Sequence, residues 1–209
     1  SATLAMFSVD DELMLNAKIG DWYYENPQRA RSNNSALLLK NSTGREDYHR
    51  LFESTRQFGE PGIIWSHSTE QLFNPCVEIS LYGYDEQGNS GWQACNLSTI
   101  NGSKLQNKEN FALAAKVASV IGTLQAGYTD FAYLGKVSES IIRREALLGV
   151  SMTGIMDYPS ITLDKNNLRE MAGIVLQTNE DIANKIGINI AARTTCVKPE
   201  GTASCLLGT

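Results

Sequence analysis

The chain has 209 residues, of which 42% are hydrophobic and 20% charged, and its formal net charge is -5. This is the composition of a globular protein that can bury a sizeable core, and an acidic balance without a block of basic residues argues against a nucleic-acid-binding surface. No apolar run approaches the roughly 20 residues that cross a bilayer, and the first residues lack the charged-then-apolar order of a signal peptide, so we expect a cytoplasmic protein without membrane contact.

Strands and helices alternate in the first third of the chain. Apolar residues recur at helical spacing over 45–58, and Gly59 and Pro61 are expected to end that helix. Ser8 is predicted to cap the first helix, which has acidic residues in its first turn. The predicted elements, in order, are a strand at 2–7, a helix from Ser8 to Gly20, an aromatic and polar connection at 21–31, a strand at 35–39, a helix at 45–58 and a strand at 63–65.

The same alternation continues after a polar loop, in which Gly88 and Asn89 mark a turn. A strand is predicted at 95–100, and helices at 107–126, at 138–148 with Gly149 as its end, and at 166–186. Residues 149–157 are interpreted as a close-packed turn, because they follow a helix and lack the order of a dinucleotide-binding loop. The faces expected to pack in the core carry Phe111, Ala114, Val117, Ile121 and Leu124 in one long helix, and Leu168, Met171, Val175, Ile182 and Ile186 in the other.

Strands that alternate with helices predict an α/β fold with mainly parallel strands. No internal repeat or low-complexity linker divides the chain, so residues 1–209 are expected to form a single segment of one domain. Composition and periodicity do not decide between an open sheet and a barrel.

The four cysteines, Cys76, Cys95, Cys196 and Cys205, are widely spaced and form no Cys-x-x-Cys pair. With two histidines in the whole chain, a zinc site is not expected. In a reducing compartment such thiols are catalytic or structural rather than parts of a disulfide scaffold. Cys196 lies in a strand-like run and Cys205 in a predicted helix, so both are interpreted as structural.

One short motif carries an unusual group of side chains. In an extended segment, residues two apart point to the same side, so Asn74, Cys76 and Glu78 would project together. The amide can form hydrogen bonds, the carboxylate can act as a general base, and the sulfur can carry an electron or a hydrogen atom. The alternative is that Cys76 is a small, buried and inert residue, as most such cysteines are.

Several motifs together resemble one enzyme family. The motif Asn74-Pro75-Cys76-Val77-Glu78-Ile79, followed by Ala94-Cys95-Asn96-Leu97-Ser98-Thr99-Ile100-Asn101, resembles the active-site finger loop of the large catalytic subunit of ribonucleotide reductases. The stretches 31–36, 149–157 and 198–204 match family motifs in the same order. The resemblance covers nearly the whole chain. It implies part of a ten-stranded α/β barrel, incomplete at both ends, with the cysteine loop threaded through its centre.

The resemblance also implies roles for individual residues. Cys76 would become a thiyl radical that abstracts the 3′ hydrogen of a ribonucleotide, and Glu78 would take the proton of the 3′ hydroxyl. Asn74 would hold the sugar hydroxyls. The 2′ hydroxyl would leave as water, and Cys95, with a partner thiol that precedes this chain, would supply the reducing equivalents. Pro75 and Val77 complete the substrate-binding motif.

A second motif resembles the loop that holds the substrate's phosphates in this family. Gly201 lets backbone approach a ligand closely, and Thr202 and Ser204 offer hydroxyl groups before a predicted helix. The turn could also be a simple helix cap. Glu200 is expected to point away from the phosphates. The substrate-binding residues implied here are Pro199, Glu200, Gly201, Thr202, Ala203 and Ser204.

A proline directly before the radical cysteine, here Pro75, resembles the motif of the adenosylcobalamin-dependent (class II) ribonucleoside-triphosphate reductases. The alternative is the metal-dependent, two-subunit (class I) diphosphate reductases, in which a metal-containing small subunit supplies the radical. The partners implied are a ribonucleoside tri- or diphosphate, a thioredoxin-type dithiol reductant, allosteric nucleotides and the rest of the reductase chain. The piece alone is expected to be inactive.

Two other functions are compatible with parts of the sequence. A non-enzymatic α/β binding module would have a buried, inert Cys76 and a solvated Glu78. A thiol hydrolase needs a histidine base, and His49 and His67 are the two candidates. Neither explains the ordered set of motifs.

Overall fold

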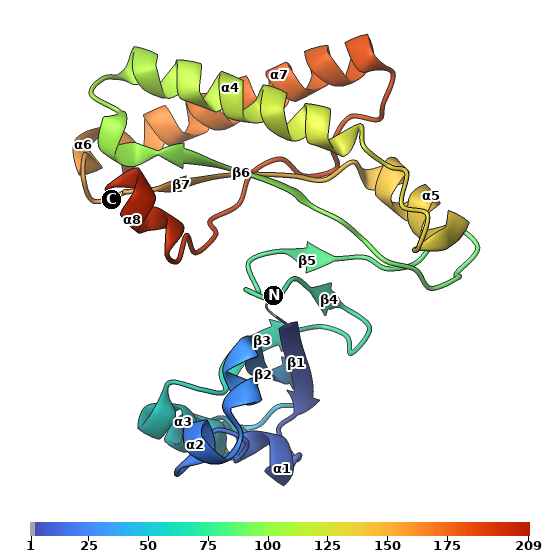
Figure 1. The fold of residues 1–209 in the computed structure, drawn as a ribbon, viewed down its shortest axis with the longest axis vertical. Coiled ribbons are helices and arrows are strands. Elements are labelled where there is room, and N and C mark those ends of the chain that lie inside the picture. The colour runs from blue at the N-terminus through green and yellow to red at the C-terminus, as the bar shows by residue number, and fades with distance from the viewer. Residues whose placement is uncertain (1–2) are drawn as a thin grey trace. The chain divides into compact units, whose positions relative to one another are not determined.

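Three parallel strands form the centre of the N-terminal part of the chain. The computed structural model describes residues 3–209 and divides them into two compact units, one ending at Tyr82 and the other beginning at Gly83. In the first unit the strand order is β1-β2-β3, and both pairings are parallel (Figure 1). The strands are β1 (Thr3–Ser8), β2 (Ser32–Leu39) and β3 (Gly62–Ser66).

Helices connect these strands, as the alternation predicted. α3 (Arg45–Phe58) has the predicted bounds and ends at Gly59, whose φ of 75° is the left-handed conformation that glycine adopts without strain. Leu51 of α3 packs into a buried cluster with side chains from β1 and β2. That cluster consists of Phe7, Val9, Leu15, Ala36, Leu38 and Leu51.

The connection between β1 and β2 differs from the prediction. Ser8 does not cap the first helix, because Asp11 takes that place and its Oδ1 accepts a hydrogen bond from Met14 N at 3.0 Å. The resulting α1 (Glu12–Leu15) is a single turn that ends before Gly20. The aromatic and polar connection at 21–31, for which no helix was predicted, contains α2 (Trp22–Glu25) and the 3-10 helix η1 (Pro27–Arg31). Residue 2 of the first predicted strand lies outside the described residues.

The second unit has a two-stranded parallel sheet of β6 (Asn96–Asn101) and β7 (Leu148–Thr153). Two long helices, α4 (Lys108–Ala126) and α7 (Lys165–Ile186), pack on each other and on one face of this sheet (Figure 1). Shorter elements are η2 (Gly102–Lys104), α5 (Gly135–Glu145), α6 (Pro159–Thr162) and α8 (Ala203–Leu207). The core beneath the helices contains Ile100, Leu105, Phe111, Ala115, Ala118, Val150, Met171 and Val175.

β7 corrects two predictions. The helix predicted to end at Gly149 ends at Glu145, where Ala146 caps it with a φ of 41°, and Gly149 lies inside the strand. The first residues of the predicted turn are therefore a buried strand. The continuous apolar run around Leu148 and Val150 is typical of a parallel strand that is covered by helices. Because apolar and polar residues do not alternate in this run, the pattern did not predict a strand.

α4 buries a different face from the predicted one. Phe111 is buried as expected, but Val117, Ile121 and Leu124 are exposed. The buried face consists instead of small residues, namely Ala115, Ala118, Ser119, Gly122, Thr123 and Ala126. Small side chains let α4 lie close to α7, and the Ser119 hydroxyl donates to the carbonyl of Val175 at 2.8 Å. In α7, Met171 and Val175 are buried as predicted, whereas Leu168 and Ile186 are exposed.

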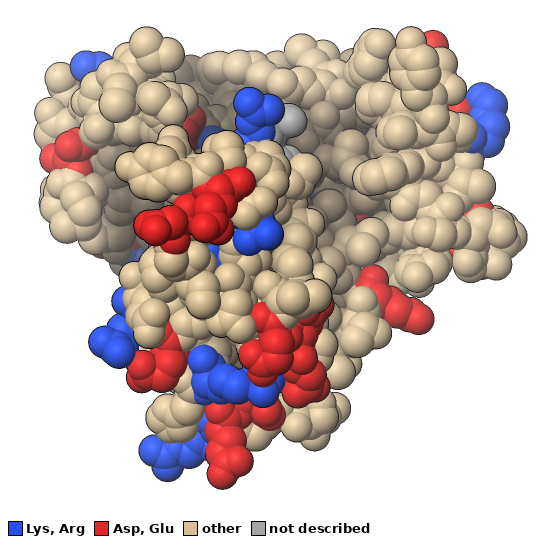
Figure 2. All heavy atoms as spheres, turned by 60° about the horizontal axis from the view of Figure 1, so that its bottom comes forward, with Lys and Arg blue, Asp and Glu red and all other residues tan. Residues whose placement is uncertain are grey.

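Charges of both signs lie side by side on the molecular face in Figure 2. In the first unit, Arg50 forms ion pairs with Asp10 and Glu12, and Arg56 pairs with Glu53. In each of these pairs the opposite charges lie close together and compensate one another. Within residues 3–209, no helix combines the length and apolar character needed to span a membrane.

Candidate functional site

The cysteine motif forms the tip of a β-hairpin. β4 (Leu72–Phe73) and β5 (Ser80–Leu81) pair antiparallel, with Phe73 opposite Ser80, and residues 74–79 connect them. The predicted extended segment is therefore wrong. Val77 N donates to the carbonyl of Asn74 at 2.9 Å, which closes a tight turn with Pro75 at its second position. Proline fixes the φ angle that this turn position needs.

Asn74 anchors the loop instead of projecting beside the thiol. Its Oδ1 accepts a hydrogen bond from Ile79 N at 3.0 Å, and its own backbone N–H donates to the carbonyl of Ile79 at 3.2 Å. One side chain thus joins both ends of the loop. The Nδ2 group of Asn74 is not used in this closure and can donate to a ligand.

Asn33 supports the loop from a neighbouring strand. It lies in β2, and its Nδ2 donates to the carbonyl of Pro75 at 2.5 Å. Asn33 belongs to the 31–36 stretch that matches a family motif, but no role was predicted for it. The contact joins residues far apart in sequence, so local spacing carried no signal for it.

Val77 has an unusual backbone conformation directly after Cys76. Its φ is 66°, in the left-handed region, where a β-branched side chain is strained. Such strain costs on the order of 1–3 kcal/mol and is found most often at functional sites. Here it turns the chain sharply at the thiol.

Cys76 and Glu78 differ in exposure. Cys76 is exposed at the hairpin tip, so the interpretation of this residue as a buried, inert cysteine is wrong. Glu78 is half-buried, and its Oε2 is buried without a hydrogen-bond partner among the described residues. A sheltered carboxylate oxygen without a donor is suited to accept a proton from a ligand. The loop therefore offers a reachable thiol and a proton acceptor two residues apart.

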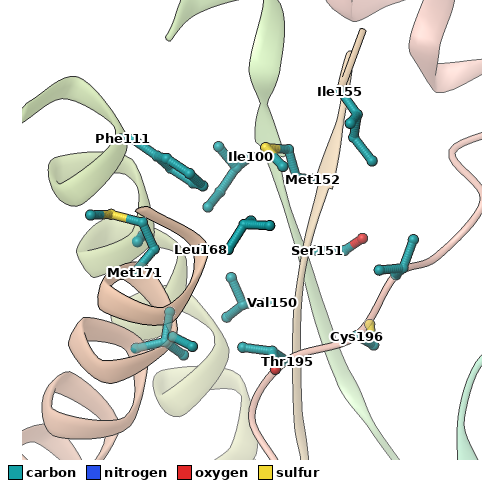
Figure 3. A pocket seen from close by; sticks show the side chains of 14 residues that line it. Ile100, Phe111, Val150, Ser151, Met152, Ile155, Leu168, Met171, Thr195 and Cys196 are labelled. Carbon is teal, nitrogen blue, oxygen red and sulfur yellow. The ribbon is translucent and has the colours of Figure 1, made fainter. Parts of the chain in front are cut away.

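In the second unit, α4 and α7 cover one face of the sheet, and we call the opposite face, which these two helices do not cover, the open face. β7 pairs with β6, with Gly149 opposite Leu97. Because β7 is a strand, its alternate side chains point to opposite faces of the sheet. Figure 3 shows the side chain of Val150 on the side of the helices and that of Ser151 on the other side. Cys95 directly precedes β6, and its Sγ lies 3.3 Å from the position that a Cβ of Gly149 would occupy. Cys95 is therefore next to the face that carries Ser151.

The 198–200 segment is bound to this open face. Lys198 N donates to the Ser151 hydroxyl at 3.0 Å, and the Thr99 hydroxyl donates to Glu200 Oε2 at 2.9 Å. Lys198 Nζ pairs with the same carboxylate oxygen at 2.5 Å. Burial raises the pKa of Glu200, but the hydrogen bonds from Lys198 and Thr99 and the Lys198 charge outweigh it, so the net pKa is below the ordinary 4.5. Glu200 is ionised and its charge is compensated.

The turn at Gly201 precedes α8. Gly201 has a φ of 59°, and a Cβ there would meet no atom within 4 Å, so the backbone conformation rather than crowding requires glycine. The Ser204 hydroxyl donates to the Gly201 carbonyl at 2.7 Å, and Thr202 forms no side-chain cap. The predicted helix is present, but it spans only Ala203–Leu207, and Cys205 in it is exposed.

A cavity of about 430 Å³ lies in the second unit (Figure 3). Its walls are mostly apolar and come from β6, β7, α4, α7 and the 195–197 segment, including Ile100, Phe111, Val150, Met152, Met171 and Cys196. None of the predicted catalytic residues lines it. In the described part of the chain, no cluster of three His, Cys, Asp or Glu residues is arranged to hold a metal ion.

Comparisons with known proteins agree on one group. The chain is 26% identical, over its full length, to adenosylcobalamin-dependent ribonucleoside-triphosphate reductases of Lactobacillus delbrueckii subsp. bulgaricus and Lactobacillus leichmannii, and covers 32% of each. It is 29% identical to the enzyme of that name from Lacticaseibacillus paracasei, over 76% of this chain and 22% of the relative. The chain thus spans about a third or less of these relatives. No family model matches.

The fold has a counterpart among solved structures. A crystal structure of a B-12 dependent (class II) ribonucleotide reductase superposes with a TM-score of 0.69, at 23% sequence identity. The match covers 99% of this chain and 33% of that one. The two polypeptides share a fold over nearly all of the chain.

Proposed function

We propose, from the premise that this chain is a homologue of the adenosylcobalamin-dependent ribonucleoside-triphosphate reductases, that it is the part of a ribonucleotide reductase that carries the radical cysteine. The reaction is the reduction of ribonucleotides to 2′-deoxyribonucleotides. The observation that carries the proposal is the hairpin tip, where Cys76 is exposed and the sheltered Oε2 of Glu78 lies in the same loop. This tip belongs to the segment that aligns with the relatives.

Each residue of the 74–79 loop named here has its own role at the sugar of the substrate. Cys76, as a thiyl radical, takes the 3′ hydrogen atom, and Glu78 takes the proton of the 3′ hydroxyl. The 2′ hydroxyl then leaves as water. Asn74 donates through Nδ2 to a sugar hydroxyl while its Oδ1 keeps the loop closed. Pro75 and Val77 shape the turn that presents the thiol, and Asn33 braces it.

Cys95 supplies reducing equivalents together with a second thiol of the complete protein. Its half-buried position beside the open face of the sheet supports this role, because a thiol there is shielded from bulk solvent but can still exchange with another thiol. A thioredoxin-type dithiol is the external reductant.

The 199–204 turn binds the substrate's phosphates. The resemblance to the family loop supports this, and the compensated charge of Glu200 removes the repulsion that a bare carboxylate would exert on an anion. The backbone of Gly201 is open on the side where a Cβ would stand, so a phosphate can approach it. The substrate is a ribonucleoside triphosphate.

The described residues fit a radical acceptor, since the Cys76 thiol is exposed on a short hairpin. Adenosylcobalamin, when bound, supplies the radical. Cys76 is the residue of this chain that would receive the radical. The relatives named above support adenosylcobalamin as the radical source over a metal-containing small subunit.

The parallel strands of the two units are parts of a ten-stranded α/β barrel, in which the 74–79 loop is the central finger loop. The complete protein works in the cytoplasm and responds to allosteric nucleotides. These features rest on the homology, which extends over the whole chain.

The test is an activity assay of the full-length protein with ribonucleoside triphosphates and a dithiol. We expect deoxynucleotide formation that depends on added adenosylcobalamin and needs no second protein. Turnover that requires an iron- or manganese-loaded partner instead would contradict the class, and absence of deoxynucleotide under both conditions would contradict the function.

A further inference from the structure

Two cysteines that are far apart in sequence meet beside Gly149. Cys95 directly precedes β6, and Cys196 follows Thr195, which pairs with Val150 on the other edge of β7. The sulfur atoms of Cys95 and Cys196 lie 3.3 and 3.2 Å from the point that a Cβ of Gly149 would occupy. The two sulfurs are therefore no farther apart than the sum of these distances.

Gly149 keeps the space between the two thiols open. A Cβ at this position would collide with Leu97 Cδ2 and would stand against both sulfurs. Glycine inside a strand weakens it and often marks a place where other groups approach the backbone closely. Here the approaching groups are Leu97 and the two thiols.

The segment that carries Cys196 runs beside β7. Three backbone hydrogen bonds hold it there, from Leu148 N to the Arg193 carbonyl at 3.0 Å, from Val150 N to the Thr194 carbonyl at 2.9 Å and from Cys196 N to the Val150 carbonyl at 3.1 Å. A disulfide needs Cβ atoms about 3.5–4.5 Å apart, so rotation of the two cysteine side chains, with a small backbone adjustment, would bring the sulfurs to bonding distance. Both cysteines are half-buried and within reach of a small reagent.

We propose that Cys95 and Cys196 form a redox pair that closes to a disulfide within the second unit. With a small-molecule disulfide as oxidant, the thiolate of one cysteine attacks it and releases one thiol. The other cysteine then attacks the mixed disulfide and releases the second thiol. Two electrons pass from the pair to the oxidant, and the two protons end on the released thiols. The proposal stands on this geometry and does not depend on the proposed function.

The experiment uses the full-length protein, glutathione disulfide as the oxidant, and peptide mapping by mass spectrometry. We expect a linked pair of peptides, one with Cys95 and one with Cys196, that is two hydrogen atoms lighter than their sum and disappears with dithiothreitol. Cys196→Ser should abolish the link, while Cys205→Ser, the control at an exposed thiol, should leave its yield unchanged.

A second variant tests the role of Gly149. Gly149→Ala puts a methyl group between the sulfurs, and strain in a disulfide amounts to several kcal/mol, so the equilibrium yield of the link should fall by at least about tenfold. The proposal is overturned if the wild-type protein gives Cys95 linked to another cysteine, or Cys95 and Cys196 as separate glutathione adducts, without the Cys95–Cys196 peptide. This measurement uses the wild-type protein, so it tests the proposal even if the Gly149→Ala variant does not fold.

Discussion

Val77 holds the sharpest backbone turn of the cysteine loop. Because its φ of 66° is strained for a β-branched residue, Val77→Gly should relieve the strain and leave thermal stability unchanged or higher, despite the entropy that glycine adds to the unfolded state. Val197→Gly, at an exposed valine without a positive φ, is the matched control and should lower stability. Thermal denaturation of the full-length variants measures both. A loss at Val77→Gly as large as at Val197→Gly would show that the turn is unstrained.

The role proposed for Cys95 is to supply electrons for the reduction of the substrate, whereas Cys76 carries the radical. Cys95→Ser should still permit radical formation at Cys76 but block steady-state turnover with a dithiol reductant, because the site lacks one of the two thiols that supply the electrons. Comparison of radical formation, followed by electron paramagnetic resonance, with the steady-state rate of deoxynucleotide formation in the full-length protein separates the two steps, with Cys205→Ser as the control. Steady-state turnover at the wild-type rate would refute the role.

At the scale of single residues, residue type and spacing indicated candidate site residues but not their geometry, and their roles stay predictions. Cys76 and Glu78 were chosen because a cysteine flanked two residues away by an amide and a carboxylate is an unusual grouping. The common projection of Asn74 with them was wrong, because Pro75 initiates a turn and the Asn74 amide closes it. The brace from Asn33 depends on a tertiary contact that no local pattern contains.

Among the elements, the 199–204 turn is the one for which we propose binding of the substrate's phosphates. Gly201→Val imposes a side chain at a φ of 59° and fills the space next to the backbone. A displacement of the substrate by about 1 Å costs on the order of a hundredfold in rate, so KM should rise and kcat should fall together. Steady-state kinetics of the full-length variant measures both constants.

The matched control is Gly187→Val, at the end of α7, which has a similar φ of 75° and equally open surroundings. It carries the same backbone strain outside the turn, so only stability should change. Unchanged constants for Gly201→Val would mean that the phosphates bind elsewhere.

Glu200 makes the attachment of this turn to β6 sensitive to acid. Its pKa is lowered in the folded state, so the ionised form stabilises the fold; this contribution is complete above about 4.5 and is lost as the pH falls through the lower folded value. Glu200→Gln should therefore lower the melting temperature at pH 7, and the difference from wild type should shrink below pH 4.5. Glu180→Gln, at an exposed residue of α7, is the control. A difference that grows on acidification would contradict the lowered pKa.

Elements with strong periodicity and clear end signals were predicted well. α3 and α7 have the expected ends because Gly59 and Gly187 adopt left-handed conformations that stop a helix. β7 was missed, because a strand buried between neighbours lacks alternation and its glycine looked like a helix end. The buried face of α4 was assigned to large apolar residues, whereas close packing against α7 selects small ones.

For the whole molecule, the alternation of elements was sufficient for the α/β class with parallel strands, which the structure confirms. A ten-stranded barrel requires pairings beyond those of β1-β2-β3 and β6-β7, so no pattern within this chain could predict its closure. The membership of residues 1–209 in one catalytic domain stays a prediction.

The radical role of Cys76 is the central claim, and deoxynucleotide formation by Cys76→Ser in the full-length protein tests it most directly. Serine keeps the size and the turn but cannot form a thiyl radical, so turnover should be lost while the fold and nucleotide affinity stay close to wild type. Cys205→Ser, also at an exposed thiol, should retain full activity. Turnover by Cys76→Ser above the background of the assay would contradict the account.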